Sequence, residues 1–394
     1  MPFDNLSSDP DQDYFVDGIV EDVIANLARN RWLTVIARNS TFAYKGKATG
    51  VRQIAREIGV RYIVEGSVRK FGNRVRITAQ LIHAPDGDHV WAERYDRDLE
   101  DIFQLQDEIA NQIAATIEPQ LVVAESLRAR GAEPEDLDAW DLYLRGTWHL
   151  YTFTEAGLKE AKGYFERAIE RDADLAAAYG RLAYVHVQRY WYGPLANRDS
   201  EIDRAFEAAR RAITLDERDA LGHFALGRAY ALRHEFENAA SELRRTIDLN
   251  PNFAQAHFAL GQNHYYCDRL EAALDQINTA ITLSPHDQHI WTFYLVRAFA
   301  FCKLGDLEAA ERSAWAGVRQ ANATYWAFAG LASILGQAGK KDDAGTVIGE
   351  LFTLKPEYSC AYAEADLGNL PGEKFTANFI RGLREVGVPK SSAF

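Results

Sequence analysis

"HFALGRAYALRHEFENAASELRRTIDLNP" (223–251) recurs 34 residues later as "HFALGQNHYYCDRLEAALDQINTAITLSP" (257–285). Five equivalent positions of the two copies carry the pattern, and a second pair of segments follows it in the same phase. The equivalent residues are His223, Gly227, Ala239, Leu243 and Pro251 with His257, Gly261, Ala273, Ile277 and Pro285, and Gly305, Ala310 and Ala314 with Gly339, Ala344 and Ile348. A fixed period of this length predicts a row of stacked units in which each unit contacts its neighbours.

The 34-residue period is typical of tetratricopeptide repeats, in which each unit is a pair of antiparallel helices. A small residue stands where the two helices cross, and Pro follows the second helix because it cannot continue one. We expect six hairpins over residues 140–358, the first of which combines "AWDLYLRGTWHLY" (139–151) with "EAKGYFERAIERDAD" (160–174). Residues 359–394 are predicted to form a C-terminal capping segment, in which a helix from 373 closes the array.

The first helix of each hairpin lines the inner face of such a superhelix. Counting along the repeat places a mixture of aromatic, amide and cationic residues there, which suits a peptide or protein partner. The predicted partner-binding residues are Arg181, Tyr184, Gln188, Phe224, Arg228, Phe258, Gln262, Tyr265, Tyr266, Phe299 and Lys303. The alternative is that several of the aromatic residues fill the superhelix itself. Lys, Asn and Arg do not cluster on this face, so a clamp for a peptide carboxylate is not expected.

The first third of the chain has the pattern of an α/β domain over residues 1–127. Helical spacing over 13–30 is followed by the apolar segment "LTVIAR" (33–38), which predicts a short strand. A second helix from residue 51 ends at Gly59, and three strands follow, of which "RVRITAQLI" (74–82) alternates strictly between apolar and polar residues. A helix over 101–121 completes the order βαβαβββα in a mixed sheet, and 128–139 is the predicted linker.

The segment "VRQIAREIGV" (51–60) also resembles the start of a helix-turn-helix. That motif requires a second, polar helix whose side chains reach the edges of DNA bases. The residues that follow, "RYIVEGSVRK" (61–70), are rich in β-branched side chains and predict a strand. The sequence therefore indicates a packing helix here, and direct nucleic-acid binding is not expected.

Several of these stretches together resemble the TolB amino-terminal-like domain. The quoted stretches are "PFDNLSSDPDQDYFVDGIVEDV", "VIARNSTFAYKGK", "AREIGVRYIVEGSVRK", "RVRITAQLI" and "HVWAERYDRDLEDIFQLQDEIA". The likeness is nearest to the version that precedes tetratricopeptide repeats in the C-terminal regions of bacterial regulators of the adenylate cyclase and winged-helix types. It implies an effector domain elsewhere in a parent protein and covers nearly the whole chain.

The resemblance also predicts that the first strand is truncated. In the family an apolar stretch precedes "PFDNLS", whereas here Met1 stands where that strand should be ending. A helix that follows a missing strand loses packing surface. We therefore expect the chain to be part of a longer regulator, with the rest of the strand and an upstream cyclase or DNA-binding domain.

Composition excludes several classes of protein. Net charge is −13, which opposes phosphate binding by the chain as a whole. The three cysteines are widely spaced, so neither a disulfide framework nor a zinc site is predicted. The longest apolar run, "YWAFAGLASILG" (325–336), is too short to span a bilayer. We expect a cytoplasmic protein, or a periplasmic one if a membrane helix lies upstream in the parent.

Charge is segregated within the first domain. Residues 4–22 are acidic and residues 38–76 are basic. The predicted anion-binding residues are Lys45, Lys47, Arg52, Arg56 and Arg61. The alternative is that the acidic and basic segments face each other or that both are simply solvated.

No catalytic pattern is found. The Gly-rich phosphate loop, the HExxH metal motif and the GxSxG nucleophile elbow are all missing, so we expect no enzyme activity, no cofactor and no metal. The sequence thus predicts a non-catalytic interaction and regulatory scaffold of a bacterial signalling protein. The alternatives are the C-terminal part of a cyclase or winged-helix regulator, and anion or nucleic-acid binding by residues 38–76.

Overall fold

The computed structural model describes residues 1–7, 13–28, 33–47, 49–98, 102–129, 138–150, 152, 154–192, 198–285, 287, 289–367 and 373–391. The chain forms two compact units. The first holds residues 1–225 and 246–253, and the second holds residues 226–245 and 254–394.

The first unit begins with a four-stranded mixed sheet in the order β1-β2-β3-β4. Its strands are β1 (Asp4–Asn5), β2 (Tyr62–Phe71), β3 (Arg74–His83) and β4 (Asp88–Asp98). β1 runs parallel to β2, with Asp4 opposite Ser67, and the other neighbours are antiparallel. The alternation predicted for residues 74–82 is confirmed, because the apolar side chains of β3 at 75, 77, 79 and 81 are all buried.

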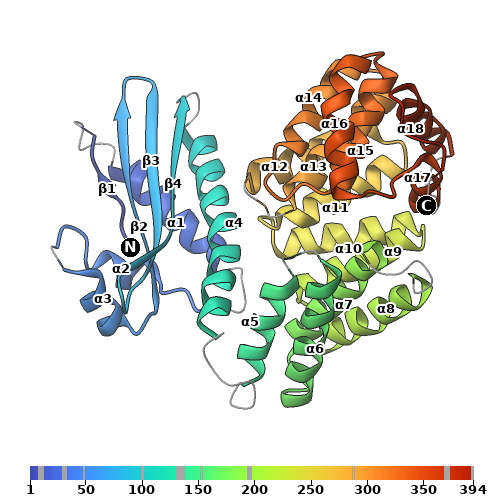
Figure 1. Cartoon of the computed structure of the whole chain (residues 1–394). Helices are drawn as coiled ribbons and strands as arrows, with labels where there is room; N and C mark the ends of the chain where they lie inside the picture. The colour runs from blue at the N-terminus through green and yellow to red at the C-terminus, as the bar shows by residue number, and fades with distance from the viewer. Residues whose placement is uncertain are drawn as a thin grey trace. The chain divides into compact units, whose positions relative to one another are not determined.

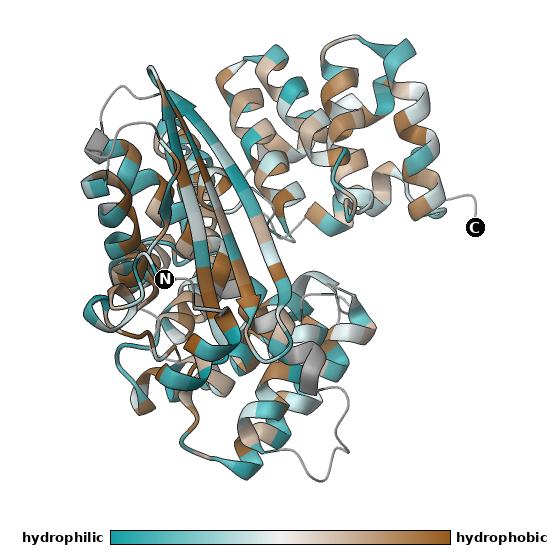
Figure 2. Ribbon diagram, turned by 90° about the vertical axis from the view of Figure 1, so that its left-hand side faces the viewer, coloured by the Kyte–Doolittle hydropathy of each residue, from teal (hydrophilic) through white to brown (hydrophobic). Residues whose placement is uncertain are grey.

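Two helices cover the buried face of the sheet. α1 (Asp13–Leu27) and α4 (Ile102–Ala129) pack against each other and against β3, as Figure 1 shows. Their shared core includes Phe15 and Ile19 from α1, Ile109 and Ile113 from α4, and Ile77 from β3. Figure 2 shows that the strands change from largely hydrophilic near the β2–β3 turn to hydrophobic at their opposite ends.

The strand predicted at residues 33–38 is not formed. Residues 33–37 have no regular structure, and Arg38 begins the short helix α2 (Arg38–Phe42). Their apolar side chains, including Leu33 and Val35, still pack against the core of the domain. The pattern correctly indicated burial, but a strand also needs a partner at hydrogen-bonding distance, and the sheet ends at the two-residue β1.

The helix predicted from residue 51 is α3 (Val51–Ile58), and Gly59 ends it as expected. Gly59 adopts the left-handed conformation with φ 73°, and its N–H donates to the carbonyl of Ala55. β2 follows directly, so the second helix of a helix-turn-helix does not exist here. α4 extends eight residues beyond the predicted end at 121, and most of the predicted linker lies outside the described residues.

Antiparallel helical hairpins follow α4. Their helices are α5 (Ala139–Leu150), α6 (Glu155–Arg171), α7 (Ala176–Tyr192), α8 (Arg198–Leu215), α9 (Ala220–Leu232), α10 (Phe236–Leu249), α11 (Ala254–Tyr266), α12 (Leu270–Leu283), α13 (Ile290–Leu304), α14 (Leu307–Val318), α15 (Tyr325–Gln337) and α16 (Lys341–Leu354). The boundary between the two units falls within α9 and α10. With the 34-residue period, this is the tetratricopeptide arrangement that the sequence predicts.

The turn inside each of the last four hairpins repeats one backbone feature. His234, Asp268, Gly305 and Gly339 all adopt positive φ, between 56° and 84°. They stand just before the second helix of their hairpins, and the first two and the last two are each 34 residues apart. Gly tolerates this conformation without cost, whereas a side chain at His234 or Asp268 carries some strain.

Two further helices, α17 (Cys360–Leu367) and α18 (Glu373–Glu385), complete the second unit. The main chain after α18 is tied to the start of α17, since Cys360 N donates to Pro389 O at 2.8 Å and Ala361 N to Lys390 O at 3.0 Å. Phe379, Ile380 and Leu383 of α18 belong to the core of this unit. Among the described residues, no helix is long and apolar enough to cross a membrane.

Candidate binding surfaces

Four of the predicted partner-binding residues lie in the first unit, and all four are buried. Arg181 Nε donates to the Tyr143 hydroxyl at 3.4 Å. Gln188 donates to the hydroxyl of Tyr184, whose ring lies 5.1 Å from that of Phe224. These side chains hold the helices of the first unit together. The alternative interpretation covered the aromatic residues Tyr184 and Phe224 but not Arg181 and Gln188.

Three aromatic members of the set in the second unit are also buried. Phe258 stacks on Phe293 at 4.4 Å between ring centroids, and Tyr265 and Phe299 are less than a tenth exposed. Burial raises the pKa of the Tyr265 hydroxyl well above its usual value. Phe258 thus lies in the core between two consecutive hairpins, whereas the rings of Tyr265 and Phe299 contact Phe375 of α18.

The remaining four residues, Arg228, Gln262, Tyr266 and Lys303, are half-buried and form what we call the inner row. Arg228 Nη1 donates to Gln262 Oε1, which occupies the same position one repeat later. Lys303 Nζ lies 2.6 Å from Asp268 Oδ1 and 4.2 Å from the ring centroid of Tyr265. The inner row thus offers a cation, an amide, an aromatic ring and an ammonium group at the helix surface.

Sequence reasoning missed three polar atoms beside this row. Asn263 Oδ1, His264 Nδ1 and the Tyr265 hydroxyl are buried and have no hydrogen-bond partner within the part of the chain that the structure describes. All three belong to the last turns of α11. Burying such groups unpaired is costly, so they mark a place where a bound molecule could supply the missing partner. The feature of the sequence that could have pointed to these atoms is the polar and aromatic run "NHYY" (263–266) at the end of a repeat helix.

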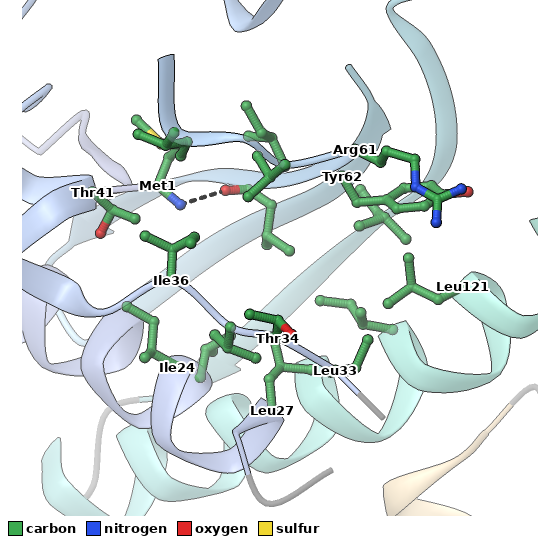
Figure 3. A pocket seen from close by; sticks show the side chains of 18 of the residues that line it. Met1, Ile24, Leu27, Leu33, Thr34, Ile36, Thr41, Arg61, Tyr62 and Leu121 are labelled. Atoms are coloured by element: carbon green, nitrogen blue, oxygen red, sulfur yellow. Dashed lines mark hydrogen bonds between the residues drawn. The ribbon is translucent and has the colours of Figure 1, made fainter. Parts of the chain in front are cut away.

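A second surface that the sequence did not reveal is a slot in the first unit, beside β2. It has a volume of about 410 Å³ and is lined mostly by apolar side chains from α1, residues 33–36, β2 and α4. Figure 3 shows Leu33, Thr34 and Ile36 along one side, with Arg61 and Tyr62 along the other. We call this cavity the β2 slot.

Met1 lies at one end of the β2 slot. Its amino group donates to the carbonyl of Val64 at 2.8 Å, drawn as the dashed line in Figure 3. Asp4 pairs with Ser67, so counting back along the parallel register brings Met1 opposite Val64. Burial lowers the pKa of this amino group to about 6, against a weaker opposing effect of Glu65. Leu6 N donates to Val68 O, so the same register assigns the Val64 carbonyl to Pro2, which has no N–H, and the Met1 amino group donates to it instead.

The predicted anion-binding residues already have neighbours on the protein. Lys45 Nζ lies 2.6 Å from Asp17 and 3.3 Å from Asp13, which belong to the acidic segment. Arg61 lies 2.9 Å from Glu125. The acidic and basic segments therefore face each other at Lys45, in agreement with the alternative interpretation.

The other three cations contact uncharged groups. Arg52 donates to the carbonyl of Asp86, and Arg56 donates to the carbonyl of Arg52 at 3.2 Å. The Lys47 ammonium lies 6.0 Å from the Tyr44 ring. The five cations thus do not converge on one free anion-binding centre.

Within the described residues, no group of three or more His, Cys, Asp or Glu side chains could hold a metal ion. Cys267, Cys302 and Cys360 are free thiols. Burial raises the pKa of Cys302 to about 12, which keeps this thiol protonated and unreactive at neutral pH. The prediction that this chain carries no catalytic, metal or cofactor site stays a prediction.

Comparison with known proteins gives one relative in sequence and several in structure. No family model matches the chain. A protein of Rhizobium meliloti (strain 1021) named "Putative adenylate cyclase 3" is 40% identical over 242 residues, which are 61% of this chain and 41% of the relative. The chain therefore matches about two fifths of that protein's length.

The solved structures that resemble the chain include tetratricopeptide proteins. TTC0263, from Thermus thermophilus, is 19% identical with a TM-score of 0.42, covering 50% of this chain and 98% of its own. YrrB, described as a tetratricopeptide protein with an unusual peptide-binding site, is 17% identical with a TM-score of 0.34, covering 52% of this chain and 96% of its own. These likenesses are too low to carry an argument about function. The assignment of tetratricopeptide hairpins to this chain is therefore based on its 34-residue repeat and on the helices of its own structure.

Proposed function

We propose that the chain is a non-catalytic interaction and regulatory scaffold of a bacterial signalling protein, and that it binds a protein or peptide partner on the inner face of its helical hairpins. The observation that carries this proposal is the inner row. Arg228, Gln262, Tyr266 and Lys303 are accessible, chemically diverse and placed on consecutive first helices. Tyr and Arg are among the residues that dominate the affinity of protein interfaces once a partner has buried them.

The charge of the inner row indicates the chemistry of the partner. Lys303 is held by the carboxylate of Asp268, and Arg228 by the neutral amide of Gln262. The contact with Gln262 therefore does not neutralise the positive charge of Arg228. This guanidinium can bind a carboxylate or a backbone carbonyl of a partner. Tyr266, one turn after Gln262 on α11, adds an aromatic surface.

The experiment is capture of partners on the immobilised chain, their identification by mass spectrometry, and measurement of each Kd with purified partner. We expect Arg228→Ala and Tyr266→Ala each to weaken binding about tenfold or more, because each removes a contact of the hot-spot class. Arg312→Ala is the matched control, since Arg312 is an exposed cation on α14, the second helix of its hairpin. Equal Kd values for all four proteins would remove the inner face from the proposal.

A second candidate function is favoured by the sequence relative. At 40% identity to part of "Putative adenylate cyclase 3", the chain corresponds to a segment of a protein whose name implies a cyclase. We propose that such a segment regulates the effector domain of its parent and does not itself act on ATP. Incubation of the chain with ATP and Mg²⁺ or Mn²⁺ should then give no cyclic AMP. Formation of cyclic AMP by the pure chain would overturn this assignment.

The TolB amino-terminal-like identity of the first domain also remains a proposal, as do the domain boundaries at 127, 139 and 358. The mixed sheet with α1 and α4 on one face supports this identity. Limited proteolysis should cut between residues 128 and 139 if the linker is placed correctly. A stable fragment that ends well before 128 or well after 139 would require other boundaries.

A further inference from the structure

α18 lies on the inner face of the second unit. Phe375, at its start, lies 4.9 Å from the ring of Phe299 and 6.0 Å from the ring of Tyr265. One turn later, Phe379 lies 5.9 Å from Phe299. α18 therefore contacts residues of α11 and α13 that the repeat places on the surface expected to receive a partner.

The contact between α18 and α15 is equally close. Ser333 and Gly336 follow Phe299 and Cys302 by 34 residues, so they occupy the same repeat positions on the next hairpin. Ser333 Oγ donates to the carbonyl of Phe379 at 2.9 Å. A Cβ added to Gly382 would lie 2.1 Å from Ser333 O, and one added to Gly336 would lie 1.9 Å from Gly382 O. Figure 1 draws α18 directly beside α15.

α18 has the chemistry of a helical ligand seated in a groove. Phe375, Phe379 and Leu383 follow one another at intervals of four residues, which places them on one side of the helix. Phe379, Leu383 and the adjacent Ile380 are buried, while Arg381 and Arg384 on the other side are exposed. An apolar stripe of this spacing laid against first-helix surfaces is the helix-in-groove mode of recognition.

α18 leaves one polar group of the groove unpaired among the described residues. The Tyr265 hydroxyl is buried near Phe375 and has no hydrogen-bond partner in the described part of the chain. Phe375 offers it only an aromatic ring. α18 is not part of the hairpins α5 to α16, so its departure breaks none of them, and the main-chain bonds of Cys360 and Ala361 to residues 389 and 390 hold only the segment after it. Its ion pairs Lys341–Glu385 and Arg384–Glu364 involve side chains that are more than half exposed.

We propose that α18 is an intramolecular stand-in for the partner of this groove, and that the partner is an amphipathic helix with aromatic side chains at positions i and i+4 that binds by displacing α18. This inference rests on the proposed function and adds the form of the partner and its regulation. A partner helix that also presents a polar group to Tyr265 competes better than α18 does. The groove of the free protein is thus closed against ligands that lack this pattern.

The test uses a fluorescent peptide of residues 373–390 and the full chain. Gly382→Val introduces a side chain where α15 leaves no room, so the chain's own α18 cannot seat while the wild-type peptide still can. Gly345→Val is the matched control, because a Cβ at Gly345 of α16 meets nothing within 4 Å. By fluorescence anisotropy we expect the peptide to bind Gly382→Val at least tenfold more tightly than the wild type or Gly345→Val. A peptide carrying Phe375→Ala and Phe379→Ala should lose that gain.

Equal binding of the peptide to all three proteins, or none to a folded Gly382→Val chain, overturns the proposal. If Gly382→Val does not fold, the chain variant Phe375→Ala, Phe379→Ala takes its place with the same expected gain. Hydrogen exchange of the wild type is an independent test, since α18 amides should exchange faster than those of α15.

If the peptide does not bind as expected while Arg228→Ala still weakens binding of a captured partner, α18 is not a stand-in but the proposed function survives. If both fail, the inner face is not the binding surface.

Discussion

Gly227 and Gly261 stand where the two helices of a hairpin approach each other. A Cβ on Gly261 would lie 2.7 Å from Ile277 Cγ1 and 3.0 Å from the carbonyl of Ala273. A Cβ on Gly227 would meet Leu243 and Ala239, the residues that align with Ile277 and Ala273 in the repeat. The same three repeat positions thus create the close contact in two successive hairpins, which explains why the repeat retains a small residue there.

Gly261→Val is expected to lower the free energy of unfolding by about 2 kcal/mol, because the added atoms overpack a crossing whose neighbour is partly backbone. Chemical denaturation followed by circular dichroism measures the change. Gly345→Val, where the new side chain meets open space, should change the free energy by less than about 0.5 kcal/mol. Equal losses in both variants would mean that the cost comes from placing Val in a helix and not from the close approach of the two helices.

Single residues mark how far the sequence could predict the candidate surface. The repeat positions identified Arg228, Gln262, Tyr266 and Lys303 from spacing alone. Spacing could not say that Arg181 and Phe224 are buried, because burial depends on side chains from other helices such as Tyr143 and Tyr184. The same limit explains why the unpaired Tyr265 hydroxyl was not foreseen.

Among the elements, the β2 slot lies between the short strand β1 and residues 33–36, part of the segment 33–38 in which a strand was predicted but does not form. The parallel register of β1 continues backward to Met1 and Val64, and the slot extends from there along Tyr62 and Arg61. Residues 33–36 line its opposite side. An extended apolar segment placed in the slot would lie between these two walls and could hydrogen-bond to β2 in the parallel pattern.

We predict that joining Val-Thr-Val-Val to the amino end of Met1 raises the melting temperature by several degrees, since burying a few apolar side chains contributes about 1.5–3 kcal/mol for each one that is fully buried. Gly-Ser-Gly-Ser is the matched control, as it converts the Met1 amine to an amide without filling the slot. Differential scanning calorimetry compares the three proteins. No difference between the two extensions would show that the slot does not accept a strand.

The pH dependence of stability is a second test of the β2 slot, because the Met1 amino group lies at one end of it. The pKa of the Met1 amine is about 6 in the folded protein, below its usual value of 8.0. The unfolded chain therefore binds more protons between pH 6 and 8, so the contribution of the neutral amine is present above pH 8 and is lost as the pH falls to 6. The loss is up to about 2–3 kcal/mol in the chain as it stands. Both extensions should abolish it.

Local patterns predicted those elements whose partners are adjacent in sequence. The β2–β3 hairpin follows from alternation and the turn at Gly72, and α3 follows from its apolar spacing and Gly59. The segment 33–37 and α18 behaved differently. The first has a strand-like sequence but no strand beside it, and the second was expected as a closing helix, but the sequence did not say that its apolar side would lie against α15, the first helix of the last hairpin. Neither outcome can be read from the segment itself.

Across the whole molecule, the net charge of −13 and the ion pairs within the first domain argue against anion or nucleic-acid binding by residues 38–76. Binding of a DNA duplex requires cations that are free to replace the counterions of phosphates. Lys45 and Arg61 are occupied by carboxylates, and Arg52 by a backbone carbonyl. The rest of the chain adds further negative charge, which repels an anionic partner at long range.

We therefore predict no mobility shift of a 30-base-pair duplex by the full chain in 50 mM KCl, where phosphate contacts would be strongest. The variant Asp13→Asn, Asp17→Asn leaves Lys45 without its two carboxylates and lowers the net negative charge by two. It should still fail to shift the duplex, because one freed cation supplies only a single phosphate contact. A shift by the wild type that weakens steeply between 50 and 200 mM salt would restore the basic segment 38–76 as an anion-binding surface. A shift by the variant alone would show that the acidic segment masks one.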